Sequence, residues 1–423
     1  MALKIEFNTD INGIALDSHP TESNSIWKDF SNIIEGPDYG FFNVNKRSEL
    51  LASCEEVYSN YQDKTHFIQV GIGGSSLGPE MLISALKTSS RQFTFINNID
   101  PDAITDQLGE IKPNNALFYF VSKSGGTAET MASLAIVTNW LSEKGVKESD
   151  FKNYFVFATD PEKSDLLNIG KSWGVTCLEV PTNVGGRFSV LTPVGLLPAL
   201  FAGINARELL EGAENIKEVL LERDLKKNDL FKSALVLKNL KEKGFTQTVL
   251  MPYSSKLRDL SFWFVQLWAE SLGKKLDKNG NLVNTGLTPL PSYGATDQHS
   301  QVQLFMEGPK DKVTLFLKIN SFENDFPLKN DIPGKSLEKL STYSLSQLME
   351  AELNGTLKAM EEAERPFLLL SIDKRDANHV GQILLYLESL TVLMGVFLNI
   401  DPFDQPGVEA GKKYAFEWLE KSK

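Results

Sequence analysis

The chain contains several short segments whose residues can bind an anion or move a proton. Residues 184–189 read VGGRFS, so that Arg187, whose guanidinium is always charged, directly follows two glycines. Paired glycines allow a tight turn in which backbone N–H groups approach a ligand closely. Thr192 and Pro193 are an expected N-cap and first helical residue, which together predict an anion site at a helix entrance. The alternative is a structural turn in which Arg187 pairs with a carboxylate.

A second segment follows an expected buried strand at residues 116–121. It places the hydroxyls of Ser122, Ser124 and Thr127 beside Lys123 and two glycines, where a helix is expected to begin. Several short donors at a helix N-terminus suit a phosphate monoester, because the helix dipole favours negative charge there. We therefore favour phosphate binding over the alternative, a helix merely capped by Thr127.

Residues 71–79, GIGGSSLGP, form a glycine-rich turn between an expected strand and an expected helix. The turn can present N–H groups to an anion, but it lacks both the dinucleotide spacing and the lysine of a nucleotide-binding loop. A tight turn without any ligand would need the same glycines. The segment is therefore weak evidence of a ligand site when taken alone.

The expected helix at residues 257–272 places Gln266 and Glu270 on one face. A carboxylate among apolar neighbours tends to have a raised pKa, which suits a general base. The alternative is that Glu270 simply pairs with Lys274, four residues further on.

Two further residues could transfer protons. His299 lies in a polar loop and can titrate near neutral pH, although a loop histidine is commonly unremarkable. The other histidines, His19, His66 and His379, stand in surface or packing contexts. Lys412 falls early in an expected terminal helix, where the dipole disfavours a cation, so that a function is one explanation for its position.

The composition is that of an ordinary globular protein: 423 residues, of which 42% are hydrophobic and 23% charged. The net charge of −12 argues against a nucleic-acid binder. Cys54 and Cys177 are the only cysteines, which excludes a disulfide framework and favours a reducing, cytoplasmic setting. The first residues lack a signal-peptide pattern, and residues 383–400 are better explained as a buried helix than as a membrane span.

Strand-like and helix-like segments alternate along most of the chain, which predicts an α/β fold with parallel sheets covered by helices on both faces. Ligands in such sheets bind beyond the carboxyl ends of the strands. The segments that this pattern predicts as strands are residues 66–70, 93–96, 116–121, 154–158, 177–180, 248–251, 313–319 and 367–372.

Taken together, these motifs resemble the phosphoglucose isomerase family. Residues 183–195 and 399–412 are similar to two signatures of that family. The glycine turn, the serine-lysine loop, Glu270 with Lys274, and His299 follow in the same chain order. The resemblance spans about residues 67–412. It implies two sugar-isomerase-type α/β domains, each a three-layer sandwich, and a homodimer whose active site lies at the subunit interface.

The resemblance also implies a role for each matching residue. Glu270 resembles the base that moves a proton between C1 and C2 of a sugar phosphate, and Arg187 the group that stabilises the enediolate. His299, reaching in from the partner subunit, resembles the ring-opening histidine, and Lys412 the lysine at the ring oxygen. The residues expected to bind substrate are Gly74, Ser75, Ser122, Lys123, Ser124, Thr127, Gly186, Gln266 and Gln405. No metal or other cofactor is implied.

We expect an N-terminal extension at residues 1–45, α/β domains at 46–198 and 199–400, and a C-terminal loop and helix at 401–423. The chain departs from the family pattern at Gly125-Gly126, at Pro406 and in its short N-terminal portion. Two rival functions remain open. One is an isomerase that also accepts mannose 6-phosphate, and the other is a non-catalytic sugar-phosphate sensor, which would not need Glu270, His299 and Lys412 together.

Overall fold

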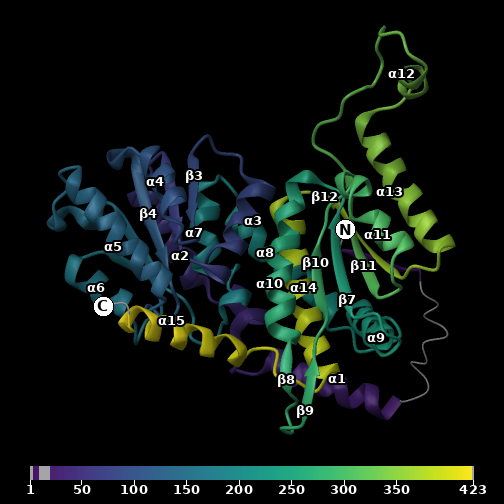
Figure 1. Cartoon of the computed structure of the whole chain (residues 1–423), viewed down its shortest axis with the longest axis horizontal. Helices are drawn as coiled ribbons and strands as arrows, with labels where there is room; N and C mark the ends of the chain where they lie inside the picture. The colour runs from purple at the N-terminus through teal and green to yellow at the C-terminus, as the bar shows by residue number, and fades with distance from the viewer. Residues whose placement is uncertain (1–2, 9–19, 422–423) are drawn as a thin grey trace.

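The computed structural model describes residues 3–8 and 20–421, and it contains two five-stranded sheets, each set among helices (Figure 1). His19 and parts of the expected segments 1–45 and 401–423 lie outside the described residues. The predicted α/β class with parallel sheets is confirmed.

The first sheet is entirely parallel, with strand order β3-β2-β4-β5-β6. Its central strand β4 is fully buried, and alternate residues enter opposite hydrophobic clusters: Leu117, Tyr119 and Val121 on one face, Phe118 and Phe120 on the other. Helices therefore cover both faces, as the unbroken hydrophobic run predicts. The strands are β2 (His66–Val70), β3 (Gln92–Ile96), β4 (Ala116–Val121), β5 (Phe155–Thr159) and β6 (Thr176–Glu179).

Capping side chains mark the starts of two helices around this sheet. Ser164 caps α6 by accepting a hydrogen bond from Leu167, and Thr192 caps α7 with Pro193 as the first helical residue. The helices are α2 (Ser48–Asn60), α3 (Leu77–Leu86), α4 (Pro101–Gly109), α5 (Ala128–Glu143), α6 (Asp165–Trp173) and α7 (Pro193–Phe201).

The second sheet has strand order β1-β12-β11-β7-β10 and is parallel except for its edge strand β1. The N-terminal strand thus belongs to the sheet formed by the second half of the chain. A separate two-stranded hairpin, β8 and β9, follows α10. The strands are β1 (Lys4–Phe7), β7 (Gln247–Pro252), β8 (Lys274–Leu276), β9 (Leu282–Thr285), β10 (Thr288–Pro291), β11 (Lys312–Ser321) and β12 (Phe367–Lys374).

Helices also cover both faces of the second sheet. Leu353 and Met360 of α13 pack on one face, while α14 and its neighbours pack on the other. The remaining helices of the chain, of which α12 and α15 have no buried residue and do not cover this sheet, are α1 (Pro20–Glu35), α8 (Ala206–Leu220), α9 (Asp229–Glu242), α10 (Arg258–Leu272), α11 (Val302–Glu307), α12 (Lys335–Leu340), α13 (Leu345–Glu362), α14 (Ala377–Phe397) and α15 (Glu409–Lys421).

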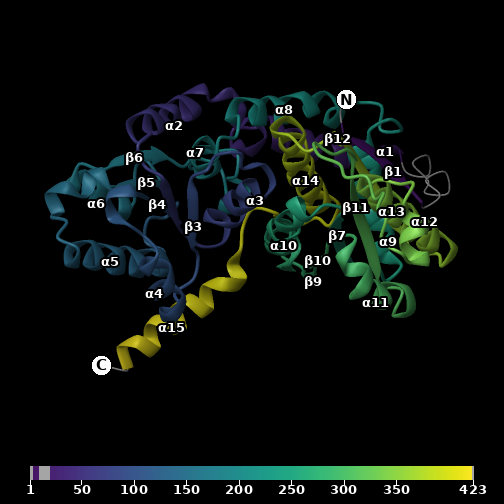
Figure 2. The ribbon, with the colours of Figure 1, turned by 90° about the horizontal axis from the view of Figure 1, so that it is seen from above.

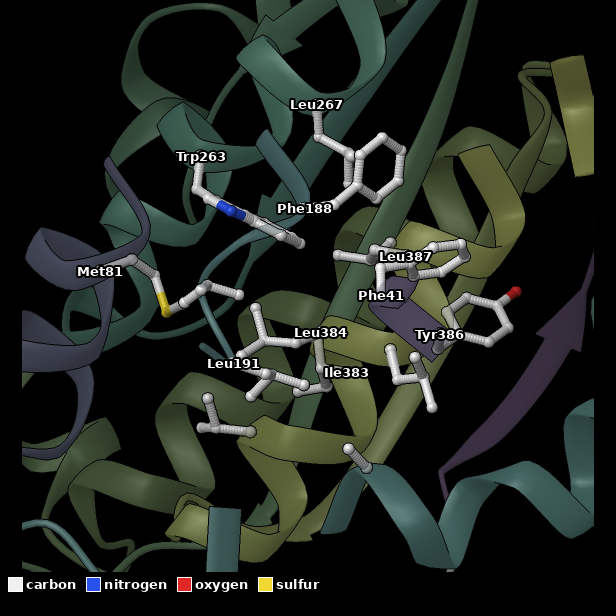
Figure 3. Packing of buried hydrophobic residues seen from close by; sticks show 14 of the residues in the cluster. Phe41, Met81, Phe188, Leu191, Trp263, Leu267, Ile383, Leu384, Tyr386 and Leu387 are labelled. Atoms are coloured by element: carbon white, nitrogen blue, oxygen red, sulfur yellow. The ribbon is translucent and has the colours of Figure 1, made fainter. Parts of the chain in front are cut away.

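The helix α14 lies at the centre of the core and packs against α8, α9, α10 and α1. Within the described residues it is the one helix long and apolar enough to cross a membrane, yet 94% of its apolar window is buried inside the protein. Figure 3 shows Leu384 and Leu387 of this helix beside Trp263 of α10 and Phe188. One hydrophobic cluster therefore continues from the first sheet to the second and fixes their relative position.

Glu388 places a carboxyl group inside this core. Its side chain is fully buried on α14, and neither carboxyl oxygen has a hydrogen-bond partner among the described residues. Burial raises the pKa of Glu388 well above its usual value of 4.5. The folded protein therefore keeps a proton here that the unfolded chain releases.

We expect the contribution of Glu388 to stability to fall as the pH rises above 4.5, because unfolding then releases the proton of Glu388. The loss reaches at most about 1.4 kcal/mol per pH unit for one proton. Glu388→Gln removes this contribution. The unfolding free energy of the variant minus that of the wild type should therefore increase between about pH 5 and pH 8 in denaturant titrations. The exposed Glu218→Gln is the control, and an advantage of Glu388→Gln that does not change with pH would contradict the assignment.

Candidate active site

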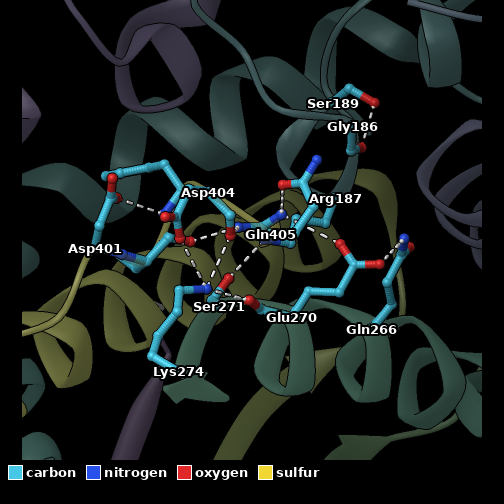
Figure 4. Close-up of polar contacts among 12 residues, drawn as sticks. Gly186, Arg187, Ser189, Gln266, Glu270, Ser271, Lys274, Asp401, Asp404 and Gln405 are labelled. Carbon is cyan, nitrogen blue, oxygen red and sulfur yellow. Dashed lines mark hydrogen bonds and ion pairs between the residues drawn. The ribbon is translucent and has the colours of Figure 1, made fainter. Parts of the chain in front are cut away.

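The candidate site lies where the first sheet meets the C-terminal end of α10. The loops that follow β2 and β6 form two short 3-10 helices, η2 (Gly73–Ser75) and η5 (Gly186–Phe188), which contact each other and α10. These loops stand at the carboxyl ends of parallel strands, where ligands bind in α/β sheets. The segment 401–405 completes the group and leads into α15 (Figure 4).

Arg187 is the centre of the hydrogen-bond network. Only 3% of the residue is exposed, and its Nε donates to the hydroxyl of Ser271 at 2.8 Å. Its Nη1 donates to Glu270 Oε2 at 3.2 Å and to Gln405 Oε1 at 2.9 Å. Its Nη2 donates to the carbonyls of Pro402 and Asp404. Burial lowers the pKa of Arg187, and the carboxylate of Glu270 opposes that shift.

The carboxylate of Glu270 is held at both oxygens but remains reachable. Oε2 pairs with Arg187, and Oε1 accepts a hydrogen bond from Gln266 Nε2 at 3.1 Å. The side chain is 34% exposed, whereas that of Arg187 is 2% exposed. Arg187 therefore does pair with a carboxylate, as the structural alternative expects, but that carboxylate belongs to Glu270, the residue expected to accept the proton. A positioned, accessible carboxylate is what a general base requires.

Lys274 does not pair with the Glu270 carboxylate, so that alternative is wrong. Its Nζ donates instead to the backbone carbonyl of Glu270 at 2.6 Å and to that of Asp404 at 2.8 Å. It also forms an ion pair with Asp404 Oδ1 at 3.3 Å. Burial lowers the pKa of the Lys274 ammonium. Lys274 thus joins the end of α10 to the segment 401–405 and leaves the Glu270 carboxylate free for Arg187 and Gln266.

The glycine turn packs against the Arg187 loop at very short range. A Cβ atom on Gly74 would lie 2.2 Å from the carbonyl oxygen of Gly186, so only glycine fits there. Gly73 has a φ of +60°, and a Cβ on it would lie 2.8 Å from Gln266 Nε2. Ser75 is half-buried in the same turn, and its carbonyl accepts a hydrogen bond from Gln69. The glycines therefore serve close backbone packing beside Gln266 and Arg187.

The serine-lysine loop gathers its hydroxyls at the start of α5. The Ser122 and Thr127 hydroxyls are 2.9 Å apart, and the Ser124 hydroxyl lies 3.4 Å from that of Thr127. Thr127 is the N-cap residue, but its side chain makes no capping hydrogen bond. A merely capped helix therefore does not explain this loop.

Lys123 connects this loop to the Arg187 loop, because its Nζ donates to the carbonyls of Thr182 and Val184 at 2.7 and 2.9 Å. Burial lowers the pKa of Lys123. Gly125 has a φ of +67°, and a Cβ on it would overlap the Ser164 hydroxyl. The close contact between Gly125 and Ser164 makes this part of the loop tightly packed rather than loose.

Two expected residues lie apart from the Arg187 network in the single chain. His299 ends the short helix η7 (Thr296–His299), is exposed, and its ring makes no hydrogen bond with the described residues. Lys412 lies on α15, is 62% exposed, and pairs with Glu409 at 2.8 Å. The structure thus brings together Arg187, Glu270, Gln266 and Gln405 with the glycine turn, but leaves His299 and Lys412 at the surface.

The sequence interpretation missed Ser271, Asp404 and the supporting role of Lys274. Ser271 and Asp404 stand directly beside Glu270 and Gln405, which was the available signal. A hydrogen bond that Arg187 donates to a residue more than 80 positions away leaves no local pattern. Among the residues that the structure describes, no group of three or more His, Cys, Asp or Glu side chains could hold a metal ion.

The fold and this site define an α/β protein of the sugar-phosphate isomerase class. The chain matches the family described as Phosphoglucose isomerase over residues 24–423, and it belongs to that family. A glucose-6-phosphate isomerase of Carboxydothermus hydrogenoformans is 37% identical, and the match covers 99% of this chain and 95% of the relative.

Solved structures share the fold of this chain. A hypothetical protein from Thermus thermophilus has a TM-score of 0.90 and 33% identity, over 98% of this chain and 100% of that one. A glucose-6-phosphate isomerase from Chlamydia trachomatis has a TM-score of 0.85 at 23% identity, over 100% of this chain and 89% of the other. This second likeness concerns the fold alone.

The contact between the glycine turn and the Arg187 loop can be tested with a matched pair of variants. We expect Gly74→Ala to destabilise the protein by about 1–3 kcal/mol and to displace Arg187, because the new methyl group meets backbone rather than a flexible side chain. Gly186→Ala is the control, since a Cβ there meets nothing within 4 Å. Thermal unfolding and crystal structures of both variants provide the measurement, and equal stability of the two would contradict the close packing.

Proposed function

We propose that this protein catalyses the reversible isomerisation of glucose 6-phosphate and fructose 6-phosphate, a reaction of glycolysis and gluconeogenesis. The observation that carries the proposal is the Glu270 carboxylate, one-third exposed and held between Arg187 and Gln266. Aldose–ketose isomerisation needs a base that removes a proton from one carbon and returns it to the next. A carboxylate fixed at both oxygens can serve both carbons without moving far.

The serine-lysine loop is the proposed phosphate site. Its three hydroxyls lie together at the start of α5, and no side chain caps that helix. The phosphate would bind here, away from the reacting carbons, and its binding energy would orient the sugar toward Glu270. Lys123 holds this loop against the Arg187 loop through Thr182 and Val184 and contributes positive charge. Gly74, Ser75, Gly186 and Gln405 border the sugar.

The reaction begins with opening of the sugar ring. His299 and Lys412 act at the ring oxygen and the C1 hydroxyl, so that the C1–O5 bond breaks while O5 gains a proton and the C1 hydroxyl loses one. Glu270 then takes the C2 proton, and the electron pair moves to give a cis-enediolate. Arg187 stabilises the negative charge, which exists only during the reaction. A proton then moves from O2 to O1, and return of the carbon-bound proton from Glu270 to C1 yields the ketose.

The proton transfers require no redox cofactor or metal ion, since the hydrogen removed from one carbon returns to its neighbour. Acid, base and charge stabilisation all come from side chains of the chain itself. The acidic composition is compatible with this chemistry, because a local basic pocket can bind a phosphate within an acidic surface.

We further propose a homodimer in which His299 completes the site of the partner subunit. His299 is exposed and outside the Arg187 network of its own chain. The helix α15 projects from the body (Figure 2) and has exposed apolar side chains, among them Tyr414, Phe416 and Leu419. Such a surface suits burial against a second copy. The two free cysteines favour a reducing, cytoplasmic setting for the enzyme.

The rival functions predict different activities. An isomerase of broader specificity would convert mannose 6-phosphate as fast as glucose 6-phosphate, and a coupled assay with both substrates distinguishes the two. A sensor would bind sugar phosphates without turnover. The fixed carboxylate of Glu270 favours catalysis, since a binding protein has no need of a base there.

The base assignment predicts that Glu270→Gln lowers kcat for fructose 6-phosphate by at least about a thousandfold while substrate still binds, because the amide cannot accept the C2 proton. A coupled assay measures kcat, and calorimetry measures the affinity for fructose 6-phosphate. The exposed Glu143→Gln serves as the matched control. Unchanged turnover in Glu270→Gln would refute the assignment of Glu270 as the base.

The shared site predicts complementation between two inactive variants. When His299→Ala and Glu270→Gln subunits are mixed and reassembled, each hybrid dimer contains one intact site. Half of the dimers are hybrids, so the activity should return to roughly a quarter of the wild-type value. If His299 acted within its own subunit, both sites of the hybrid would be defective. Mixtures that stay inactive after verified subunit exchange would therefore refute the shared site.

A further inference from the structure

The second sheet carries a cavity at the carboxyl ends of its own parallel strands, apart from the Arg187 network. It has a volume of about 610 Å³, in the range of small-molecule sites. Residues that follow β7, β11 and β12 form its wall, and the residues after β7 lead directly into α10. The proposed isomerase reaction uses none of the lining residues, which are Ser254, Ser255, Lys256, Ile319, Ser321, Phe322, Glu323, Asn324, Met349, Lys374, Arg375 and Asp376.

Polar groups at one end of this cavity have no partner in the structure. Ser254 is only 6% exposed, yet its hydroxyl makes no hydrogen bond with any described residue, and it lines the cavity. The backbone amides of Ser255 and Lys256 also lack acceptors among the described residues, and no side chain caps the short helix η6 (Ser255–Leu257) or α10. A hydroxyl that opens onto the cavity without a partner, beside free amides, is available to bind a ligand or water.

The cavity wall also contains positive charge. Lys256 is exposed and has no carboxylate partner among the described residues, while Lys374 and Arg375 stand at the end of β12. Two carboxylates are present, but both are engaged. Asp376 caps α14 and pairs with Lys374, and Glu323, whose side chain is 81% exposed, lies 3.8 Å from Arg375. The lining therefore has one positive charge in excess, and Lys256 is free to bind an anion.

The same set of groups occurs in the proposed phosphate loop of the first sheet. There, a buried parallel strand ends in Ser122, Lys123 and Ser124 at the start of α5. Here, the buried strand β7 is followed by Ser254, Ser255 and Lys256 at the start of α10. Each loop offers hydroxyls, free amides and one ammonium group at a helix N-terminus, the combination that binds phosphate.

We propose that this cavity is a second anion site, which binds the phosphate group of a small phosphate monoester through the Ser254 hydroxyl, the amides of Ser255 and Lys256, and the Lys256 ammonium. The remaining volume accommodates the organic part of the ligand beside Phe322 and Met349.

The second site and the isomerase site lie at opposite ends of α10. Lys256 precedes the first turn of the helix, whereas Glu270 is in its last turn, about 18 Å of helix from Arg258. Figure 1 shows the far end of α10 leading into β8, where α15 also begins. A ligand of the second site therefore does not compete with the isomerase substrate for the same groups.

The proposal predicts that phosphate protects Lys256 from chemical modification. The full-length protein is treated with a limiting amine-acetylating reagent at constant ionic strength, and peptide mapping gives the modification rate of each lysine. Inorganic phosphate and glycerol 3-phosphate, but not chloride, should slow acetylation of Lys256 at least about fivefold in a saturable manner, since the bound anion pairs with the ammonium. Lys339 on α12 is exposed, does not line the cavity, and should stay unprotected.

The variant Ser254→Ala should raise the phosphate concentration needed for half-protection of Lys256 at least about fivefold, while the isomerase kcat and KM stay at wild-type values. Thermal unfolding verifies that the variant is folded. Equal protection of Lys256 and Lys339, or unchanged protection in folded Ser254→Ala, would overturn the second site. These outcomes do not depend on isomerase activity, so a failure of the proposed function would be recognised separately.

Discussion

The rest of the site depends on the hydrogen bonds that the buried guanidinium of Arg187 donates. A charge on a residue that is only 3% exposed is costly unless every donor has an acceptor. The chain meets this need with Ser271 and Glu270 from α10, and with Gln405 and two carbonyls from the segment 401–405. Because these acceptors come from two distant parts of the chain, the geometry of the site and the contact between the two sheets are established together.

The hydrophobic core supports this arrangement. α10 has one side in the core, through Trp263 and Leu267, and its last turn in the polar network. Lys274 connects the same turn to the segment 401–405, because its Nζ donates to the backbone carbonyls of both Glu270 and Asp404. Glu270 therefore sits on a rigid helix rather than on a loop, which is the arrangement that holds a catalytic group to a fraction of an ångström.

Much of the fold can be predicted from local pattern. β4 occurs at the residues where the sequence predicts it, because six consecutive apolar residues suit a strand buried on both faces, and the caps Ser164 and Thr192 mark helix starts. The edge strands β1 and β10 escape such a prediction, since β1 has no buried residue and β10 contains two prolines. Their pairing is long-range, and nothing in their own sequence specifies the partner.

The site is predictable in part for the same reason. Arg187, Glu270, Gln266 and Gln405 belong to motifs with recognisable types and spacing, and the structure brings them together. Ser271 and Lys274 act through contacts between distant segments and have no separate signal. His299 and Lys412 lie apart from this network in the single chain, and their place in the site depends on the proposed partner subunit and on α15.

The chain passes from the second sheet to the first and back again, so neither half of the sequence forms a complete sheet and site by itself. β1 pairs with β12 in the second sheet, after which the chain builds the first sheet and then returns. On the way, Tyr39 stacks on Phe403 with ring centroids 3.6 Å apart, so that the N-terminal segment supports the loop that holds Arg187. Neither half is therefore complete by itself: a cut between the sheets would separate β1 from the second sheet and the proposed base, Glu270, from the loops of the first.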